Sequence, residues 1–292
     1  MNLINQKEIL HRIQSRVNLN RFVKGIFLVA TLLVLAVLAL LLFRLISQGA
    51  GHLSLDFLGN YSSRFAAKAG IKAALVGSIL LMLVVAPVTL IIGVATAIYL
   101  EEYAPKTKLT NLIVINISNL AGVPSIIFGL LGLTVFVRGL MLGKSVLAAG
   151  LTMSLLVLPV IIVSSQEAIR GVPSDLREAS YGMGAAKWKT ILHVVLPAAI
   201  PGIATGCILA LSRAVGETAP LVILGIPVIV YFLPTGLLSE FTALPMQIFD
   251  WAKRPQPEFQ TVAAAGIVVL MVFLLLLNSL AVYIRYKYQK RY

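Results

Sequence analysis

Charged residues are scarce in this sequence: they make up 12% of its 292 residues, whereas a typical soluble domain carries about 25%. Hydrophobic residues reach 59% and the mean hydropathy is +0.95, which exclude a soluble domain and a disordered chain. Cysteine occurs only as Cys207, so no internal disulfide can form. The histidines His11, His52 and His193 are far apart and show no metal-ligand spacing. The composition therefore predicts a membrane-embedded chain without a metal site.

Six apolar runs are long enough to cross a bilayer, which takes about 20 residues of helix. We expect spanning helices at residues 26–46, 70–99, 111–137, 145–165, 198–225 and 262–284. The first run is too long for the apolar part of a signal peptide, and no clear cleavage site follows it. The predicted fold class is an all-α, polytopic membrane protein with six transmembrane helices.

Positive charge is unevenly distributed along the chain. The net charge of +13 would suggest nucleic acid in a soluble protein, but in a membrane protein such an excess gathers in cytoplasmic loops. With the N-terminus inside, the inner segments would carry 15 of the 24 Lys and Arg residues and the outer segments 8. We therefore expect an N-in/C-in orientation, contact with membrane lipids, and no nucleic-acid partner.

Motifs of membrane enzymes are missing from the sequence. It has no HExxH, no GxSxG and no paired carboxylates at a useful spacing. Glu101 and Glu102 are adjacent, so they do not share a helix face, and we expect them to mark the inner end of the second span. These absences favour a channel or a transporter subunit over an enzyme.

The inner loop at residues 166–197 is much longer than the other inner loop and predicts two short helices. Ser174 or Asp175 is expected to cap the first helix, with Glu178 at a capping-box spacing from Asp175. Gly184 is suited to end that helix in a left-handed conformation.

The second helix is expected at residues 185–195, with Pro197 as its stop. Its apolar face combines Trp188, Ile191, Leu192 and Val195 at helical spacing. Such a helix could lie on the bilayer or dock into a groove of another protein.

Residues 178–184 read Glu-Ala-Ser-Tyr-Gly-Met-Gly, and after nine residues Val194-Val195-Leu196-Pro197 follows. This segment resembles the EAA loop of bacterial ABC importer permeases, with Ser180 in place of an alanine and Val194 in place of an isoleucine. The resemblance implies a type I ABC importer permease fold and a coupling loop that engages a separate ATPase. By that resemblance the coupling residues are Glu178, Ala179, Gly184, Val194, Leu196 and Pro197.

Three other segments, at residues 122–130, 212–221 and 242–252, are similar to the phosphate branch of these permeases, and the last two to its A-type (PstA-like) subunits. The resemblance covers residues from about 68 to the C-terminus. It implies a basic N-terminal region with the first span (1–67), a permease domain (68–285) and a basic tail (286–292) in a bacterial inner membrane.

The partners implied by the resemblance are a second, C-type permease in a heterodimer, a cytoplasmic ATPase dimer and an external phosphate-binding protein. ATP and Mg²⁺ would be bound by the ATPase, with no cofactor in this chain. The alternatives are a permease for sulfate, molybdate or another oxyanion, and a stand-alone channel or secondary transporter. A secondary transporter would often show inverted repeats, which we do not find, and a channel has no use for the long inner loop.

Arg213 is expected near the middle of the fifth span, where an isolated Arg costs about 2.5–3.5 kcal/mol on insertion scales. Glu217 follows at i+4 and should share its helix face. The pair could neutralise itself, or Arg213 could bind a passing phosphate through two hydrogen bonds while Glu217 weakens that hold. We also assign Asn119, Ser125 and Thr218 to the substrate path.

A stripe of small residues on the same helix predicts close helix packing. Its members recur every four residues, on a face displaced from Arg213: Gly202, Gly206, Ala210 and Ala214.

Overall fold

The computed structural model describes residues 6–288, and its elements are helices and helical turns, apart from an isolated β-bridge between Ser145 and Glu240. The α-helices are α1 Gln6–Gly49, α2 Leu55–Gly59, α3 Lys72–Ile98, α4 Lys108–Leu120, α5 Ser125–Gly132, α6 Val146–Arg170, α7 Ser174–Gly182, α8 Lys187–Thr190, α9 Leu196–Gly216, α10 Ala219–Leu224, α11 Leu244–Lys253 and α12 Pro257–Tyr288. Short 3-10 turns are η1 Ala50–His52 and η2 Ala66–Lys68, and π-helical turns are η3 Tyr99–Tyr103, η4 Leu133–Gly139 and η5 Ile191–Val195. The end of the predicted basic tail, residues 289–292, lies outside the described residues.

Five described helices are long and apolar enough to cross a membrane, and a sixth crossing is possible if one bent pair counts as a span. Five of the predicted spans are thereby found as helices. The third, predicted as one span at 111–137, is instead two helical segments, Lys108–Leu120 and Ser125–Gly139, bent by 100°. Pro124 causes the break, since its backbone is extended at ψ 135° and its ring lacks an N–H donor.

The fifth predicted span is also interrupted. It was expected to run to residue 225, but α9 ends at Gly216 and α10 begins at Ala219. Glu217 between them has an extended backbone, with φ −74° and ψ 123°. Pro220 explains the stop, because it has no N–H to donate to the carbonyl of Gly216.

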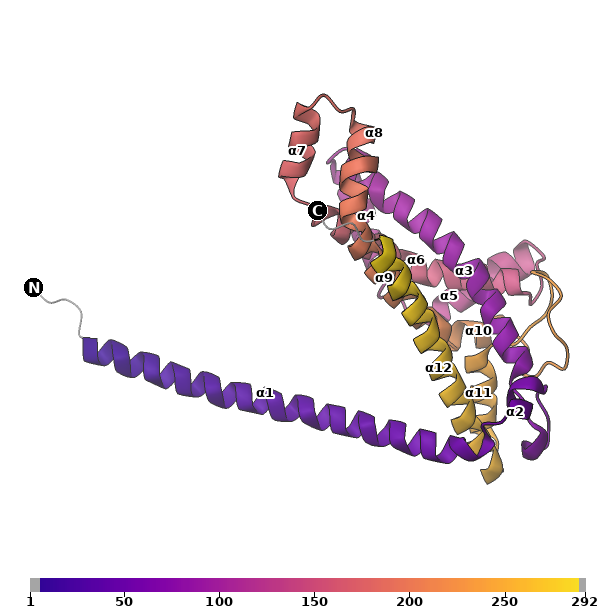
Figure 1. Cartoon of the computed structure of the whole chain (residues 1–292). Coiled ribbons are helices and arrows are strands. Elements are labelled where there is room, and N and C mark those ends of the chain that lie inside the picture. Colours follow the sequence, from indigo (N-terminus) through magenta and orange to yellow (C-terminus); the bar gives the residue numbers. More distant parts are fainter. Residues whose placement is uncertain (1–5, 289–292) are drawn as a thin grey trace, which may run out of the picture.

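The helices α3, α6 and α9 form the packed centre of the molecule (Figure 1). Gly93 of α3 faces Ile161 of α6, and an added Cβ would lie 2.7 Å from that side chain. Nearby on α6, Ser164 faces α9, and a Cβ at Gly206 of α9 would lie 2.5 Å from the Cβ of Ser164. The small-residue stripe is therefore the packing face of α9, as predicted, and Ala210 and Ala214 are buried on it.

A second cluster of buried apolar residues closes the end of the molecule opposite the α7–α8 loop. Its centre is Trp251 of α11, which is fully buried and lies 5.9 Å from the ring of Phe57. The hydroxyl of Ser78 in α3 accepts a hydrogen bond from the backbone N–H of Leu244 at 2.8 Å. This hydrogen bond anchors the start of α11 to α3.

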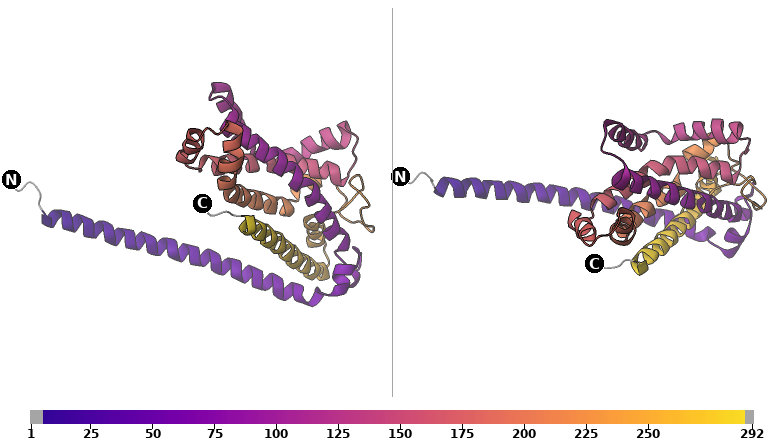
Figure 2. Two further views of the ribbon diagram at one scale, coloured as in Figure 1. Left: turned by 45° about the horizontal axis from the view of Figure 1, so that its top comes forward. Right: turned by 90° about the horizontal axis from the view of Figure 1, so that it is seen from above.

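Helix α1 leaves the body of the molecule (Figures 1 and 2). It comes close to α12 at its end, where Gly49 lies against Ala264 and Ala265. The apolar stretch from 26 to 41 is exposed throughout. Most of α1 is therefore left uncovered by the described residues.

Candidate coupling loop and substrate path

The α7–α8 loop stands at one end of the molecule (Figure 1), and Gly184 fixes its turn. Gly184 has φ +80°, the left-handed conformation predicted from the sequence. The N–H of Ala185 donates to the carbonyl of Ser180 at 3.1 Å, and the N–H of Gly184 donates to that of Tyr181 at 2.9 Å. These two bonds form a Schellman motif, which satisfies the last carbonyls of α7.

The start of α7 differs from the prediction. The helix begins at Ser174 itself, with Pro173 as the residue before it, and no side chain caps its N-terminus. The Ser174 hydroxyl donates instead to the carboxylate of Asp175 at 3.3 Å. The predicted cap at Ser174 or Asp175 was therefore wrong, because the N-cap position is held by Pro173, whose side chain has no acceptor.

The second helix was predicted to stop at Pro197, and this too was wrong. It runs without a break from Lys187 to Gly216 as one 30-residue helix. The π-helical turn η5 lies just before Leu196 and Pro197. A proline in a membrane helix is tolerated where a local π adjustment accommodates the missing donor.

Two of the four residues assigned to the apolar face of this second helix are buried and two are exposed. Ile191 and Val195 are 3% and 1% exposed and pack inward. Trp188 and Leu192 are 52% and 53% exposed, and Met183 beside them in the turn is 88% exposed. The loop therefore presents apolar side chains, at its turn and along its second helix, that no described residue covers.

Of the residues predicted for coupling, Glu178, Ala179 and Gly184 lie on the exposed side of the loop, while Val194, Leu196 and Pro197 are half-buried at its base. Glu178 forms no ion pair among the described residues. The structure places the two groups in the same loop but at its two ends.

Sequence analysis missed two ion pairs that hold this loop. Arg170 donates to both carboxylate oxygens of Glu101, at 3.2 and 3.0 Å, and Arg177 donates to Glu102 at 3.1 and 3.0 Å. The carboxylates do mark the end of a membrane helix, as predicted, but they also bind arginines 69 and 75 residues away. The spacing of neighbouring residues cannot predict a contact between side chains so far apart in the sequence.

Arg213 and Glu217 form the predicted ion pair, with Nε and Oε1 3.6 Å apart. The expectation of one shared helix face was wrong, because α9 ends between them. Arg213 lies in the last turn of α9, where a cation is favoured by the helix dipole. Its side chain is 66% exposed, against 19% for Glu217.

A small cavity adjoins this pair and opens beside the α4–α5 break. Its walls come from α6, α9 and the residues at the break, and they include Ala121, Val123, Leu156, Val157, Val160, Ala210, Arg213, Ala214 and Glu217. The pair is thus the charged part of an otherwise apolar cavity wall.

The other residues assigned to the path lie at the two helix breaks near the Arg213–Glu217 pair. Asn119 lies exposed near the end of α4, Ser125 begins α5, and Thr218 precedes α10. No described hydrogen bond joins any of them to the ion pair. Asn119 and Ser125 flank the α4–α5 break, and Thr218 lies in the break between α9 and α10.

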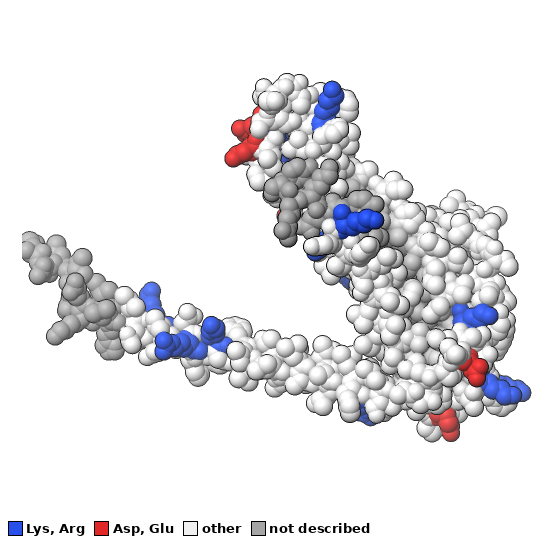
Figure 3. Space-filling model, viewed as in Figure 1, with Lys and Arg blue, Asp and Glu red and all other residues white. Residues whose placement is uncertain are grey.

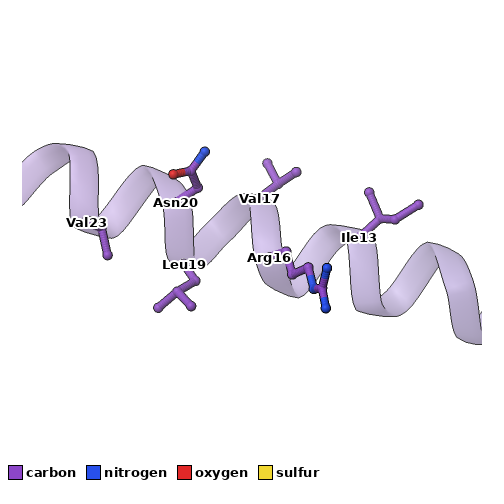
Figure 4. A pocket seen from close by; sticks show the side chains of 6 residues that line it. All are labelled: Ile13, Arg16, Val17, Leu19, Asn20 and Val23. Atoms are coloured by element: carbon purple, nitrogen blue, oxygen red, sulfur yellow. The ribbon is translucent and has the colours of Figure 1, made fainter. Parts of the chain in front are cut away.

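A second hollow, on α1, is not a site. Its lining residues, Ile13, Arg16, Val17, Leu19, Asn20 and Val23, all belong to one helix (Figure 4). Among the described residues no group of His, Cys, Asp and Glu could hold a metal ion.

The chain belongs to the family of binding-protein-dependent transport system inner membrane components, whose model matches residues 89–290. It is therefore a component of a membrane transport system. Among individual proteins, it is 32% identical over 274 residues to the probable ABC transporter permease protein YqgI of Bacillus subtilis (strain 168), an alignment that covers 90% of this chain and 93% of that protein. It is 36% identical over 212 residues to the phosphate transport system permease protein PstA of Yersinia pestis, covering 73% and 71%.

The fold is also found in a solved transporter. A chain of the inward-facing MetNI methionine ABC transporter superposes with a TM-score of 0.62 at 19% identity, covering 75% of this chain and 96% of that one. This likeness confirms the predicted ABC importer permease fold. Together with the relatives, it confirms the resemblance predicted from residues 178–197.

Proposed function

We propose that this chain is a permease subunit of an ATP-driven importer that moves inorganic phosphate across a bacterial cytoplasmic membrane. The observation that carries the proposal is Arg213 beside the α4–α5 break, in a chain similar to a phosphate permease. The resemblance of 178–197 to an EAA loop supports ATP-driven import over a stand-alone channel or secondary transporter. A permease for sulfate or molybdate remains the second candidate, since any oxyanion would find the same cation.

Arg213 is proposed to receive the anion because it is exposed, charged and next to a cavity that two helix breaks surround. A guanidinium can bind two oxygens of phosphate in parallel. Glu217 lies close enough to compete for Arg213, so it can weaken the hold and allow release. Asn119, Ser125 and Thr218 would offer hydroxyl and amide groups on either side of the breaks.

The α7–α8 loop is proposed to dock a separate cytoplasmic ATPase dimer, on which ATP and Mg²⁺ would be bound. Its exposed apolar side chains, Met183 in the turn and Trp188 and Leu192 along the second helix, need an apolar groove to cover them. This chain would then be a non-catalytic subunit without a cofactor of its own.

We further propose the N-in/C-in orientation, with the loop inside. The C-terminal end of α12 lies at the same end of the molecule as α7 and α8 (Figure 1). Arg16, Arg21 and Lys24 gather at the N-terminal part of α1, ahead of a long uncharged stretch (Figure 3). Both facts suit the rule that places basic residues in the cytoplasm.

A second permease of the C type is the proposed partner in the membrane, with an external phosphate-binding protein delivering the substrate. Helix α4 has no buried residue in this chain and α1 is exposed over most of its length. Two helices left bare in this way offer surfaces for a second helical subunit, with lipid covering the rest.

The test of the anion role is labelled phosphate uptake by Arg213→Gln, Glu217→Gln and the double variant at matched membrane levels. Arg213→Gln should abolish uptake while insertion and ATPase association survive, and Glu217→Gln should impair it by slowing release. If the pair only neutralises itself, the double variant regains uptake because no charge is left unpaired. A transporting double variant would therefore refute the role of Arg213.

ATP hydrolysis by the reconstituted assembly distinguishes phosphate from other oxyanions as the substrate. Phosphate should stimulate hydrolysis and sulfate or molybdate should not. If only sulfate stimulated hydrolysis, sulfate would replace phosphate as the proposed substrate, and the permease function would stand.

A further inference from the structure

The π-helical turn η3, at the end of α3, contacts three elements around the coupling loop. Glu101 binds Arg170 at the end of α6, and Glu102 binds Arg177 in α7. The ring of Tyr103 lies 5.2 Å from the Nζ atom of Lys187 in α8, within cation–π range. Three consecutive residues of one helix end therefore contact the end of α6, helix α7 and helix α8.

The two ion pairs differ in burial, and this decides which of them can transmit force. The side chain of Arg170 is 56% exposed, and such an exposed pair contributes little. Arg177 and Glu102 are only 19% and 8% exposed. Removing one partner of a buried pair leaves the other charge without compensation, so the Arg177–Glu102 contact is the stronger constraint.

Arg177 also closes the end of α6. Its Nη1 atom donates to the carbonyl of Val172 at 2.6 Å and its Nη2 atom to that of Ile169 at 2.9 Å. Ile169 lies in the last turn of α6 and Val172 two residues beyond its end, so Arg177 binds the carbonyls at which this helix finishes. One guanidinium thus joins α7, the end of α6 and the end of α3.

From η3 the path into the membrane is rigid. Helix α3 packs along α6 with glycines at the contacts: a Cβ at Gly93 would lie 2.7 Å from Ile161, and one at Gly150 would lie 2.5 Å from Val84. Close-packed helices have low compressibility and transmit strain from one to the other. A displacement of α7 would therefore reach α3 through Arg177 and Glu102.

We infer that Glu102 and Arg177 are positioning residues that pass movement of the coupling loop to α3, so that ATP hydrolysis is converted into transport. This inference rests on the proposal that the α7–α8 loop docks the ATPase. It concerns coupling alone, because neither residue lies at the exposed tip of the loop or beside Arg213. The two steps can therefore be separated by experiment.

The experiment uses the complete transporter reconstituted in vesicles, with Glu102→Gln and Arg177→Lys at matched membrane levels. Glu102→Gln removes the charge, and Arg177→Lys keeps it but cannot reach all three acceptors. Three quantities are measured: ATPase co-purification, ATP hydrolysis, and labelled phosphate taken up per ATP hydrolysed. Glu101→Gln, which alters the exposed pair, is the matched control.

For both variants we expect the ATPase to stay bound and to hydrolyse ATP, while phosphate uptake per ATP falls by about tenfold, as for loss of a hydrogen bond to a charged group. Glu101→Gln should change this ratio little. A merely structural pair would lower association, hydrolysis and uptake in parallel and leave the ratio unchanged. That result, or loss of ATPase binding in both variants, would overturn the inference.

Gly184→Val distinguishes failure of this inference from failure of the proposed docking. If Gly184→Val keeps the ATPase and transports normally, the docking proposal fails and this inference fails with it. If Gly184→Val loses the ATPase while Glu102→Gln and Arg177→Lys keep a normal uptake ratio, docking stands and only the coupling role is refuted.

Discussion

Ser180 stands where the EAA pattern has an alanine, and its hydroxyl has a hydrogen-bond partner. The Ser180 hydroxyl lies 2.8 Å from that of Thr190, which is buried in α8. The bond joins the two helices of the loop across the Gly184 turn. At the residue scale, the loop is held by this bond, by the Schellman motif and by the arginines.

Ser180→Ala should cost about 0.5–1.5 kcal/mol, the usual worth of one hydrogen bond. The effect stays at that size because Thr190 keeps a second partner, the carbonyl of Ala186 at 3.4 Å. Thermal unfolding of the purified subunit measures the change, and ATPase co-purification should be retained. Loss of the ATPase in this variant would mean that Ser180 itself belongs to the docking surface.

Gly184→Val should abolish ATPase association while the protein still inserts. A left-handed conformation costs a residue with a Cβ about 1–2 kcal/mol, and a β-branched one suits it least, so at φ +80° the turn would rearrange and displace the tip. Co-purification of the ATPase with tagged permease is the measurement. The control is Gly182→Ala, because Gly182 lies in α7 with open space around its Cβ position.

Sequence reasoning succeeded where a residue's role is local and failed where it depends on distant partners. The left-handed turn at Gly184 and the packing stripe on α9 follow from residue type and spacing. The ion pairs of Glu101 and Glu102 do not, since their arginines are brought near only by the packing of α3 on α6. The prediction for Arg213 and Glu217 was half right: they pair, but across a helix end.

At the element scale, proline decides where the apolar runs break, and its effect depends on what surrounds it. Pro124 bends the third run by 100° and Pro220 ends the fifth. Pro87 and Pro159 instead lie inside continuous helices. Hydropathy alone cannot separate these cases, because the apolar pattern continues through the break and the backbone geometry is set by neighbouring helices.

The contact of α6 with α9 predicts a sharp difference between two glycines. Gly206→Val should destabilise the subunit by about 1–3 kcal/mol, the usual cost of overpacking, because its Cβ would lie 2.5 Å from that of Ser164. Gly25→Val, in the exposed part of α1, should have almost no effect. Thermal unfolding of the isolated subunit in detergent compares the two, and equal shifts would contradict the packing described for α9.

At the scale of the whole molecule, the chain is a packed body with one helix extending from it. The body holds the coupling loop at one end and the Trp251 cluster at the other. Helix α1 has 44 residues and so is about 66 Å long. It meets α12 near one end, at Gly49. Packing therefore does not determine which side of the membrane its other end faces, and the distribution of basic residues is the remaining guide.

Cysteine labelling tests that orientation. Cys207 is the sole cysteine, so Cys207→Ser gives a background free of thiols. In intact cells a membrane-impermeant reagent should label Ser239→Cys, which lies near the end opposite the coupling loop, and should not reach Lys287→Cys. Opening the cells should then expose Lys287→Cys. The reverse pattern would refute the N-in/C-in arrangement.

The isolation of α1 has a consequence for how the subunit is made. This helix precedes the other helices along the chain, and it does not need them for cover, since lipid can surround its apolar side chains at little cost. The helices of the body can then associate without it. Folding of the body would thus not depend on α1, and its exposed side chains stay available to a neighbouring chain after the body has formed.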